Sequence, residues 1–330
     1  MLKKNLLKIF NAQPKKILVI GDLILDQYFE CEVNRISPEA PVPIAKVNNI
    51  IYKLGGAANA ANNLAKMGAQ VSICGTVGED NNGVLLIKLL KESNINTNLI
   101  IKLKNKKTII KKRVISNNQQ LLRIDFEDIS DISLKTQKYF INKIKENSSQ
   151  YDAVLFSDYN KGLITDHLSS SIISYFTNYF PKIKIFADPT PLTFYKYSNI
   201  FLIKPNKHEA EEIIGKKIEN DYSNLEKICK NIVKKLKCTV LVITLGKDGI
   251  AYFYKGKMKR IPAYYTKTVD ITGAGDTTIS GIIFAIISLT TIDEAIQFGN
   301  VCGAIKVGKY KTNPVSKEDI IEFITLHDIK

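Results

Sequence analysis

The residue types best suited to chemistry lie in one short segment, Asp270-Ile-Thr-Gly-Ala-Gly-Asp-Thr-Thr278, which leads into an apolar helical run. The small residues Gly273, Ala274 and Gly275 allow a tight turn whose backbone N–H groups converge beside the positive end of a helix dipole. Such a turn predicts an anion hole. A carboxylate at its edge, Asp276, is suited to act as base for a hydroxyl that attacks a phosphoryl group. The segment therefore predicts phosphoryl transfer; the alternative is a plain helix start in which the small residues only allow close packing.

Short apolar runs typical of buried strands recur along the chain and must position this segment. They cover residues 16–20, 70–74, 153–156, 183–186, 200–203 and 239–243. Segments with helical spacing alternate with them, at residues 57–67, 83–92, 134–146, 166–180, 209–214 and 225–236 and in a tail from 274 to 326. The alternation predicts an α/β fold, doubly wound around a mainly parallel sheet, as a single domain over residues 1–330.

Two stretches do not follow this alternation, at about residues 28–53 and 98–127. Within the second, residues 108–115 and 120–126 have the composition of extended, partly exposed strands. We expect the two stretches to form a small β-sheet lid that projects from the core. The lid could close over a pocket or pair with its copy in a second subunit, and either arrangement would exclude water from a reacting phosphate.

Composition narrows the range of partners. Lysine and arginine total 47 against 32 acidic residues, a net charge of +15, but the lysines are spread along the whole chain without an aromatic-interleaved basic platform. We therefore expect no nucleic-acid partner. The 5 cysteines are scattered without a C-x-x-C pair, which predicts neither disulfides nor zinc.

No segment has the length or composition of a membrane anchor. Polar residues interrupt the apolar positions of the basic segment 1–11 before a signal-peptide core can form, and the longest apolar run, residues 279–289, is too short to span a bilayer. The sequence predicts a reduced, soluble, cytoplasmic protein with no membrane partner.

Two carboxylates follow the first predicted strand, in Gly21-Asp-Leu-Ile-Leu-Asp26. Ligands of α/β sheets bind beyond the carboxyl ends of the strands, so Asp22 and Asp26 are candidates for binding sugar hydroxyls. The alternative is a turn in which an aspartate caps its own backbone.

The segment Gly55-Gly-Ala-Ala-Asn59-Ala-Ala61 is followed by Gly68 and Gly78. The paired glycines Gly55 and Gly56 let a ligand approach the backbone, and the amide of Asn59 offers a donor and an acceptor to a diol. This spacing resembles the first signature of the ribokinase-like (PfkB) carbohydrate kinases, and the segment around Asp276 resembles their second. Ile271 departs conservatively from the smaller residue that is usual there.

Within that family the chain looks most like the kinases of D-glycero-D-manno-heptose 7-phosphate. The resemblance extends over nearly the whole length and lies in residues 21–28, 35–43, 54–59, 118–125, 157–162 and 188–189. It implies ATP-dependent phosphorylation of that sugar at O1, on the route to ADP-heptose and the lipopolysaccharide core. Thr190 departs from the pattern, because we expect Lys after Asp188-Pro189 in these kinases. The alternatives are a kinase for another sugar, sugar phosphate or nucleoside, and an inactive sugar-phosphate sensor.

The resemblance also implies which residues form the site. Asp276 takes the proton from the attacking hydroxyl, for which an ordinary carboxylate pKa suffices, and the amides of residues 273–275 bind the transferring group. The sugar is expected to contact Asp22, Asp26, Gly55, Gly56, Asn59 and Asp158, and its 7-phosphate Arg35, Arg113 and Lys161. ATP is expected to contact Asn206, Lys207, His208, Glu209, Thr244, Gly246, Gly249 and Asn300. Asn206 and Glu209 are expected to hold Mg²⁺ through water, since this ion keeps several of its waters.

The expected small-molecule partners are thus a sugar phosphate and ATP, with Mg²⁺ and, as an option that the resemblance adds, a monovalent cation such as K⁺. The resemblance also implies a homodimer through the lid sheets. Many heptose kinases of this type carry a nucleotidyltransferase domain with an H-x-G-H motif, which this sequence lacks. We therefore expect a stand-alone kinase whose product another protein adenylylates. Neither G-x-G-x-x-G after the first strand nor the G-x-x-x-x-G-K-[ST] of P-loop NTPases is present.

Overall fold

The computed structural model describes residues 9–11, 13–117, 119–219, 222–288 and 290–327. Residues 1–8 and Asn118 and Leu289, which also entered the sequence analysis, lie outside the described residues. None of the helices in the described ranges is long and apolar enough to cross a membrane.

A nine-stranded sheet forms the centre of the molecule. Strand β1 pairs in parallel with β4 on one side and with β8 on the other, and the parallel pairing continues through β9 and β10 to β11 and through β4 to β5. Strand β12 pairs in antiparallel fashion with both of its neighbours, β11 and β13. The order across the sheet is β13 (Lys257–Ile261), β12 (Ile250–Tyr254), β11 (Val240–Thr244), β10 (Leu202–Ile203), β9 (Lys184–Pro189), β8 (Ala153–Asp158), β1 (Lys16–Gly21), β4 (Gln70–Gly78) and β5 (Asn96–Leu103). The predicted doubly wound α/β fold is confirmed.

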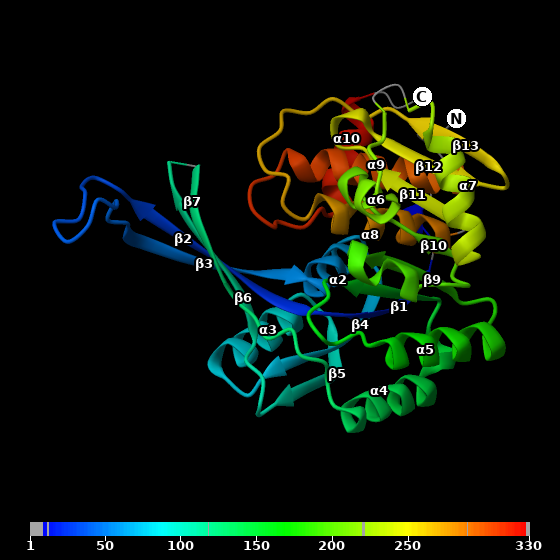
Figure 1. Cartoon of the computed structure of the whole chain (residues 1–330), viewed down its shortest axis with the longest axis horizontal. Helices are drawn as coiled ribbons and strands as arrows, with labels where there is room; N and C mark the ends of the chain where they lie inside the picture. Colours follow the sequence, from blue (N-terminus) through cyan, green and yellow to red (C-terminus); the bar gives the residue numbers. More distant parts are fainter. Residues whose placement is uncertain (1–8, 12, 118, 220–221, 289, 328–330) are drawn as a thin grey trace.

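Helices cover both faces of this sheet (Figure 1). Alternate residues of β1 enter two separate cores: Ile17 and Val19 pack in one, Leu18 and Ile20 in the other. The first core is completed by α2 (Ala57–Lys66), α3 (Asn81–Glu92), α8 (Ala274–Ile287), α9 (Ile292–Val307) and α10 (Lys317–Leu326). The second is completed by α4 (Leu134–Glu146), α5 (Asp166–Tyr179), α6 (Lys207–Ile214) and α7 (Leu225–Leu236). Continuous apolar strands are thus explained by burial on both faces.

Local sequence sets several helix boundaries. The hydroxyl oxygen of Ser133 accepts a hydrogen bond from the backbone amide of Thr136 at 3.2 Å and caps the start of α4. Thr291 caps the start of α9 through a capping box with Glu294. Helix α8 is apolar on nearly all sides because it lies between other helices of the first core. Short 3₁₀ turns occur at Ile9–Asn11, Ser148–Gln150, Pro191–Lys196 and Gly246–Asp248.

A four-stranded sheet, called here the small sheet, projects from this core (Figure 1). It consists of β3 (Lys46–Gly56), β2 (Leu23–Glu32), β6 (Ile109–Ser116) and β7 (Gln119–Phe126). Residues 98–103, which we expected in the lid, belong instead to β5 at the edge of the large sheet. The lid stretch 98–127 therefore supplies the small sheet only from residue 109 onward.

The two faces of the small sheet differ in polarity. Residues that pair across the strands share a face, so Asp26, Lys53, Lys111 and Asp125 lie on one side, together with Arg113. The next positions along each strand place apolar side chains on the opposite side: Phe29, Ile50, Tyr52, Val114, Leu122 and Ile124.

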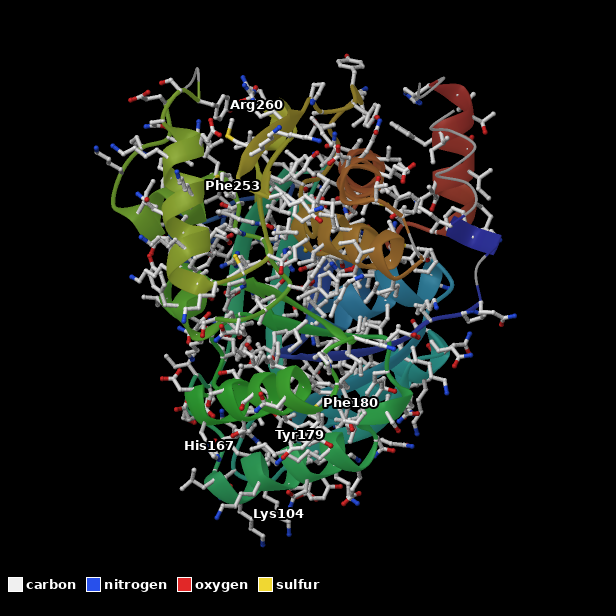
Figure 2. All side chains as sticks on the ribbon, turned by 90° about the vertical axis from the view of Figure 1, so that its right-hand side faces the viewer. Lys104, His167, Tyr179, Phe180, Phe253 and Arg260 are labelled. Atoms are coloured by element: carbon white, nitrogen blue, oxygen red, sulfur yellow. The ribbon has the colours of Figure 1, made fainter. Side chains whose placement is uncertain are left out.

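Figure 2 views the large sheet from the side away from the small sheet. Arg260 and Phe253 on the β12–β13 hairpin lie at one end of the molecule, and Lys104, which follows β5, lies at the other. The two edges of the nine-stranded sheet are therefore far from each other.

Candidate active site

A cavity of about 1010 Å³ lies where the small sheet, the ends of β8 and β9, and the N-termini of α6 and α8 meet. This volume is at the upper end of typical ligand sites and suits two small molecules side by side. Most of the predicted site residues line it: Asp26, Gly55, Gly56, Asn59, Arg113, Asp158, Asn206, Lys207, His208, Glu209, Thr244, Gly246, Gly249, Gly273, Ala274, Gly275, Asp276 and Asn300. The predicted residues Asp22, Arg35 and Lys161 do not.

Asp276 lies in the first turn of α8 and is nearly inaccessible to water. Its Oδ2 accepts a hydrogen bond from Asn59 Nδ2 at 2.7 Å, and its Oδ1 accepts one from the Tyr159 hydroxyl at 2.6 Å. Two donors from distant parts of the chain therefore fix both oxygens. Tyr159 was not predicted, although it lies in the quoted segment 157–162, because sequence alone does not reveal where its hydroxyl points.

Burial and the nearby charge of Asp188 raise the pKa of Asp276 to about 6. The hydrogen bonds from Tyr159 and Asn59 and the charge of Lys204 act in the opposite direction. We expected that an ordinary carboxylate pKa would suffice. The raised pKa of Asp276 lies closer to neutral pH. A general base is most effective when its pKa is near the pH at which it works.

The turn before α8 has the geometry of an anion-binding site. Gly273 has a φ of 77°, and a Cβ added there would lie 2.6 Å from Asn59 Nδ2, so both backbone conformation and space require glycine. The amide of Ala274 donates to the carbonyl oxygen of Ile271 at 3.1 Å and is therefore occupied. No residue in the described part of the chain accepts from the amides of Gly273 and Gly275. The predicted anion hole thus rests on these two amides rather than on three.

A buried ammonium lies beside this turn. Lys204 Nζ pairs with Asp188 Oδ1 at 2.9 Å, and a Cβ on Gly275 would be 3.4 Å from the same nitrogen. Burial acts to lower the pKa of Lys204, but Asp188, Glu209 and Asp276 raise it above its ordinary value. The lysine is consequently a permanent positive charge at the anion hole. Neither Lys204 nor Asp188 was predicted as a site residue.

The small sheet contributes charged groups to the opposite wall. Arg113 Nη1 and Asp26 Oδ1 form an ion pair at 2.6 Å, and both side chains are almost fully buried. A Cβ on Gly55 would lie 2.6 Å from Asp26 Oδ2, so this glycine gives the carboxylate its space. Lys111, two residues before Arg113 on the same face of β6, also lines the cavity. In the sequence, the i, i+2 spacing of these two cations indicates that they share one face of a strand.

The other predicted substrate residues differ in what they contact. Asp158 lines the cavity, and its carboxylate accepts from the Tyr197 hydroxyl at 2.6 Å and from the Asn160 amide at 2.9 Å. The amide nitrogen of Asn59, which we expected to bind a diol, is used to hold Asp276.

Asp22 does not line the cavity; its carboxylate instead binds backbone amides of a neighbouring loop. It is buried, and it accepts the backbone amides of Tyr159, Lys161 and Leu163 at 3.0, 3.1 and 3.3 Å. Burial, followed by the charge of Asp158, raises the pKa of Asp22 to about 6. Asp22 thus organises the loop that carries Tyr159, and this corrects its expected contact with sugar.

The two remaining candidates for the 7-phosphate also lie elsewhere. Lys161 Nζ pairs with Glu127 at 2.8 Å, and Arg35 is exposed on the connection between β2 and β3. Sequence placed them near the substrate because their segments match the family. Arg113 is the one of the three that the fold brings to the cavity.

Helix α6 begins with a capping box at the cavity. Asn206 Oδ1 accepts the Glu209 amide at 2.9 Å, and Glu209 Oε2 accepts the Asn206 amide at 2.7 Å. His208, which we expected to contact ATP, lines the cavity and is exposed at the helix start. One carboxylate oxygen of Glu209 remains outside this pair of bonds, and burial raises the pKa of Glu209.

The donors present fit Mg²⁺ held largely through water. Among the described residues, no cluster of 3 or more His, Cys, Asp and Glu side chains could enclose an ion. Glu209 and Asp188 are carboxylates that line the cavity, and burial, together with the charge of Asp188, raises the pKa of Glu209. An ion that keeps most of its waters needs only one or two such groups.

The far end of the cavity is less charged. Thr244 ends β11 and Gly246 follows it, and Asn300 on α9 donates to the carbonyl oxygen of Pro262 at 2.7 Å. That bond ties the segment after β13, which includes the cavity residues Tyr264 and Tyr265, to the helix. This end suits the flat, mostly apolar base of a nucleotide.

Comparison with known proteins agrees with this geometry. The chain matches the family model "pfkB family carbohydrate kinase" over residues 14–319. It is 39% identical to "Bifunctional protein HldE" of Sulfurimonas denitrificans over 318 residues, which cover 96% of this chain and 66% of that relative. It is 37% identical to the protein of the same name from Helicobacter pylori strain P12, over 93% of this chain and 66% of that relative. The chain thus spans about two thirds of the length of these relatives.

Phosphofructokinase-2 from Escherichia coli, solved in complex with substrates and products, superimposes with a TM-score of 0.80 at 18% identity, covering 94% of this chain and 99% of that one. Fold and comparisons together define a ribokinase-like kinase. The chain belongs to the pfkB family and is a carbohydrate kinase.

Proposed function

We propose that the protein transfers the γ-phosphoryl group of ATP to O1 of D-glycero-D-manno-heptose 7-phosphate, giving the 1,7-bisphosphate. The observation that carries the proposal is the position of Asp276: a buried carboxylate with both oxygens held by donors, at the edge of two free backbone amides and beside the ammonium of Lys204. A base, an anion site and a fixed cation at one point are the parts that phosphoryl transfer needs.

The reaction follows from these parts. Asp276 accepts the proton of the O1 hydroxyl as that oxygen forms its bond to the γ-phosphorus, and the bond from phosphorus to the leaving ADP oxygen breaks. The amides of Gly273 and Gly275 and the ammonium of Lys204 stabilise the charge on the transferring group. Mg²⁺, when bound, neutralises charge on the phosphates, and Glu209 and Asn206 are the residues proposed to hold its water shell.

The substrate assignment rests on sequence resemblance and on the charged wall of the small sheet. Lys111 and Arg113 offer two cations to a phosphate at the far end of the sugar, with Asp26 holding the guanidinium of Arg113 in place. The HldE relatives support a heptose over other acceptors. We place the reaction in the cytoplasm, as a step toward ADP-heptose and lipopolysaccharide core.

We further propose a homodimer through the small sheets. The face of the small sheet opposite its charged side exposes the apolar side chains Ile50, Tyr52, Leu122 and Ile124, each at least 38% exposed. Gln27 and Lys112 also lie on this face, beside Tyr52 and Ile124. Exposed apolar side chains gathered on a projecting sheet are typical of an interaction site. A second copy of this chain would cover it.

The variant Asp276→Asn tests the catalytic assignment. Its amide keeps the size of the carboxylate but cannot accept the proton, so turnover should fall on the order of 10²-fold to 10⁴-fold, with ATP affinity and thermal stability retained. Asp131→Asn, a matched change at an exposed position before α4, should leave turnover unchanged. Undiminished turnover in Asp276→Asn would overturn the assignment of the base.

A further inference from the structure

Lys306 is a charged residue in an unusual place. It lies in the last turn of α9, and its side chain is 0% exposed. Its Nζ donates to the backbone carbonyl oxygen of Lys311 at 2.7 Å. Burial lowers the pKa of Lys306, while the charges of Asp270 and, more weakly, Asp276 oppose that effect. Burying an ammonium is costly, so a chain that keeps one here gains something by its charge.

The acceptor is held in a strained conformation. Lys311 has a φ of 58°, in the left-handed region that residues other than glycine rarely adopt. Its side chain pairs with Glu30 of the small sheet, and the next residue, Thr312, lies against the anion hole, where a Cβ on Gly273 would be 3.7 Å from Thr312 Cγ2. Lys306 thus supports the backbone that packs on the turn before α8.

A second set of contacts reaches the same turn. The carbonyl oxygen of Val307, adjacent to Lys306, accepts the amides of Val269 and Asp270 at 2.7 and 3.1 Å. Asp270 Oδ1 then accepts the amide of Thr272 at 2.8 Å. The loop 269–273, which we call the anion-hole loop, is therefore bonded at its start to the segment that Lys306 and Lys311 close, and its end lies next to Thr312.

We infer that the ammonium of Lys306 is a resident monovalent cation that positions the anion-hole loop, in place of a bound K⁺. A dehydrated monovalent cation in a protein is held by backbone carbonyl oxygens, and here the inward carbonyl of Lys311 already has the Lys306 nitrogen at bonding distance. A K⁺ ion does not fit at that carbonyl while the ammonium is present. Lys306 is a positioning residue, since it acts on phosphoryl transfer through the loop; the inference rests on the proposed kinase function.

The test compares wild type, Lys306→Ala and Lys306→Met in KCl, NaCl and choline chloride at equal ionic strength. Wild type should show the same kcat and the same thermal unfolding midpoint in all three salts. Lys306→Ala, which opens space for an ion, should lose on the order of 10²-fold in kcat in choline chloride and regain activity and thermal stability in KCl. Lys306→Met, which fills the space without charge, should lose kcat without any rescue. Lys234→Met, the same change at an exposed position of α7, serves as the control.

The outcomes separate the inference from the kinase assignment. Activation of wild type by K⁺ over choline would overturn the resident cation while leaving the kinase intact. Full activity of Lys306→Met in choline chloride would also overturn it. Absence of turnover by wild type in every salt would instead count against the proposed function, and the thermal shift of Lys306→Ala with K⁺ would still report on the cation position. If Lys306→Ala does not fold, the salt response of wild type and the activity of Lys306→Met still test whether Lys306 replaces the cation.

Discussion

The hydroxyl of Tyr159 donates to Oδ1 of Asp276 at 2.6 Å, although 117 positions separate the two residues in the chain. The loop that carries Tyr159 is in turn held by Asp22, which accepts the Tyr159 amide at 3.0 Å. The carboxylate of Asp276, the proposed base, is therefore oriented by a residue that follows β8, and the segment after β1 keeps that residue in position. This relationship makes the protonation state of Asp276 depend on both halves of the chain.

The activity should depend on the ionisation of Asp276. Its folded-state pKa is raised to about 6, and the base must be deprotonated to act. We expect kcat/KM to be constant above about pH 7 and to fall about tenfold per unit below pH 6. A pH profile measured with circular dichroism at each pH separates this from unfolding. A flat profile down to pH 5, with the fold intact, would show that this carboxylate is not the base.

Removal of the Tyr159 hydroxyl should shift that profile. In Tyr159→Phe the ionised carboxylate loses a donor worth about 1.5–3 kcal/mol, so its pKa should rise by about one to two units. The acidic limb of kcat/KM should move to higher pH by that amount. Tyr139→Phe, at an exposed position on α4, should leave the limb in place. An unchanged limb in Tyr159→Phe would mean that the hydrogen bond does not tune the base.

Lys111 should contribute to binding of the phosphate on the sugar. The variant Lys111→Met keeps the aliphatic stem and removes the charge, so KM for the sugar phosphate should rise roughly 10-fold to 100-fold with little change in kcat. With the same sugar lacking its distal phosphate, Lys111→Met and wild type should have the same kcat/KM. Lys102→Met, an exposed lysine on β5, is the matched control. An equal effect on both sugars would place Lys111 away from the phosphate.

The oligomeric state should depend on one face of β7. The double variant Leu122→Glu with Ile124→Glu places charges on the apolar face of the small sheet and should convert a dimer to a monomer in light scattering after size exclusion. Arg123→Glu places the same charge on the opposite face of the same strand, where Arg123 pairs with Arg113, and should remain dimeric. A wild-type monomer, or a double variant that stays dimeric, would contradict the proposed interface.

Sequence periodicity predicts the core elements well because burial on one or two faces is a local signal. Helices α4 and α7 occupy the residues that their spacing indicated. Residues 98–103 of β5 were assigned to the lid because the stretch 98–127 departs from the alternation of strands and helices; their place is decided by pairing with β4. The β12–β13 hairpin was not predicted, although Lys255-Gly256, both with positive φ, forms the two-residue turn that marks such hairpins.

The site was predictable where a motif places its residues next to each other, as in Gly273 to Asp276. It was not predictable where side chains meet through the fold. Lys204 and Asp188 lie on different strand ends, and only the sheet brings their charges to the anion hole. Asp22 and Lys161 lie in segments that match the family, yet the backbone turns them toward other partners.

The most direct test of the central claim is the rate of ATP consumption by the purified protein with D-glycero-D-manno-heptose 7-phosphate, measured beside fructose 6-phosphate, ribose and adenosine. The product should be identified by the position of the new phosphate in ³¹P NMR. We predict turnover confined to the heptose, with the phosphate on O1. Turnover with one of the other acceptors, and none with the heptose, would contradict the proposed substrate while leaving the kinase fold and the role of Asp276 in place.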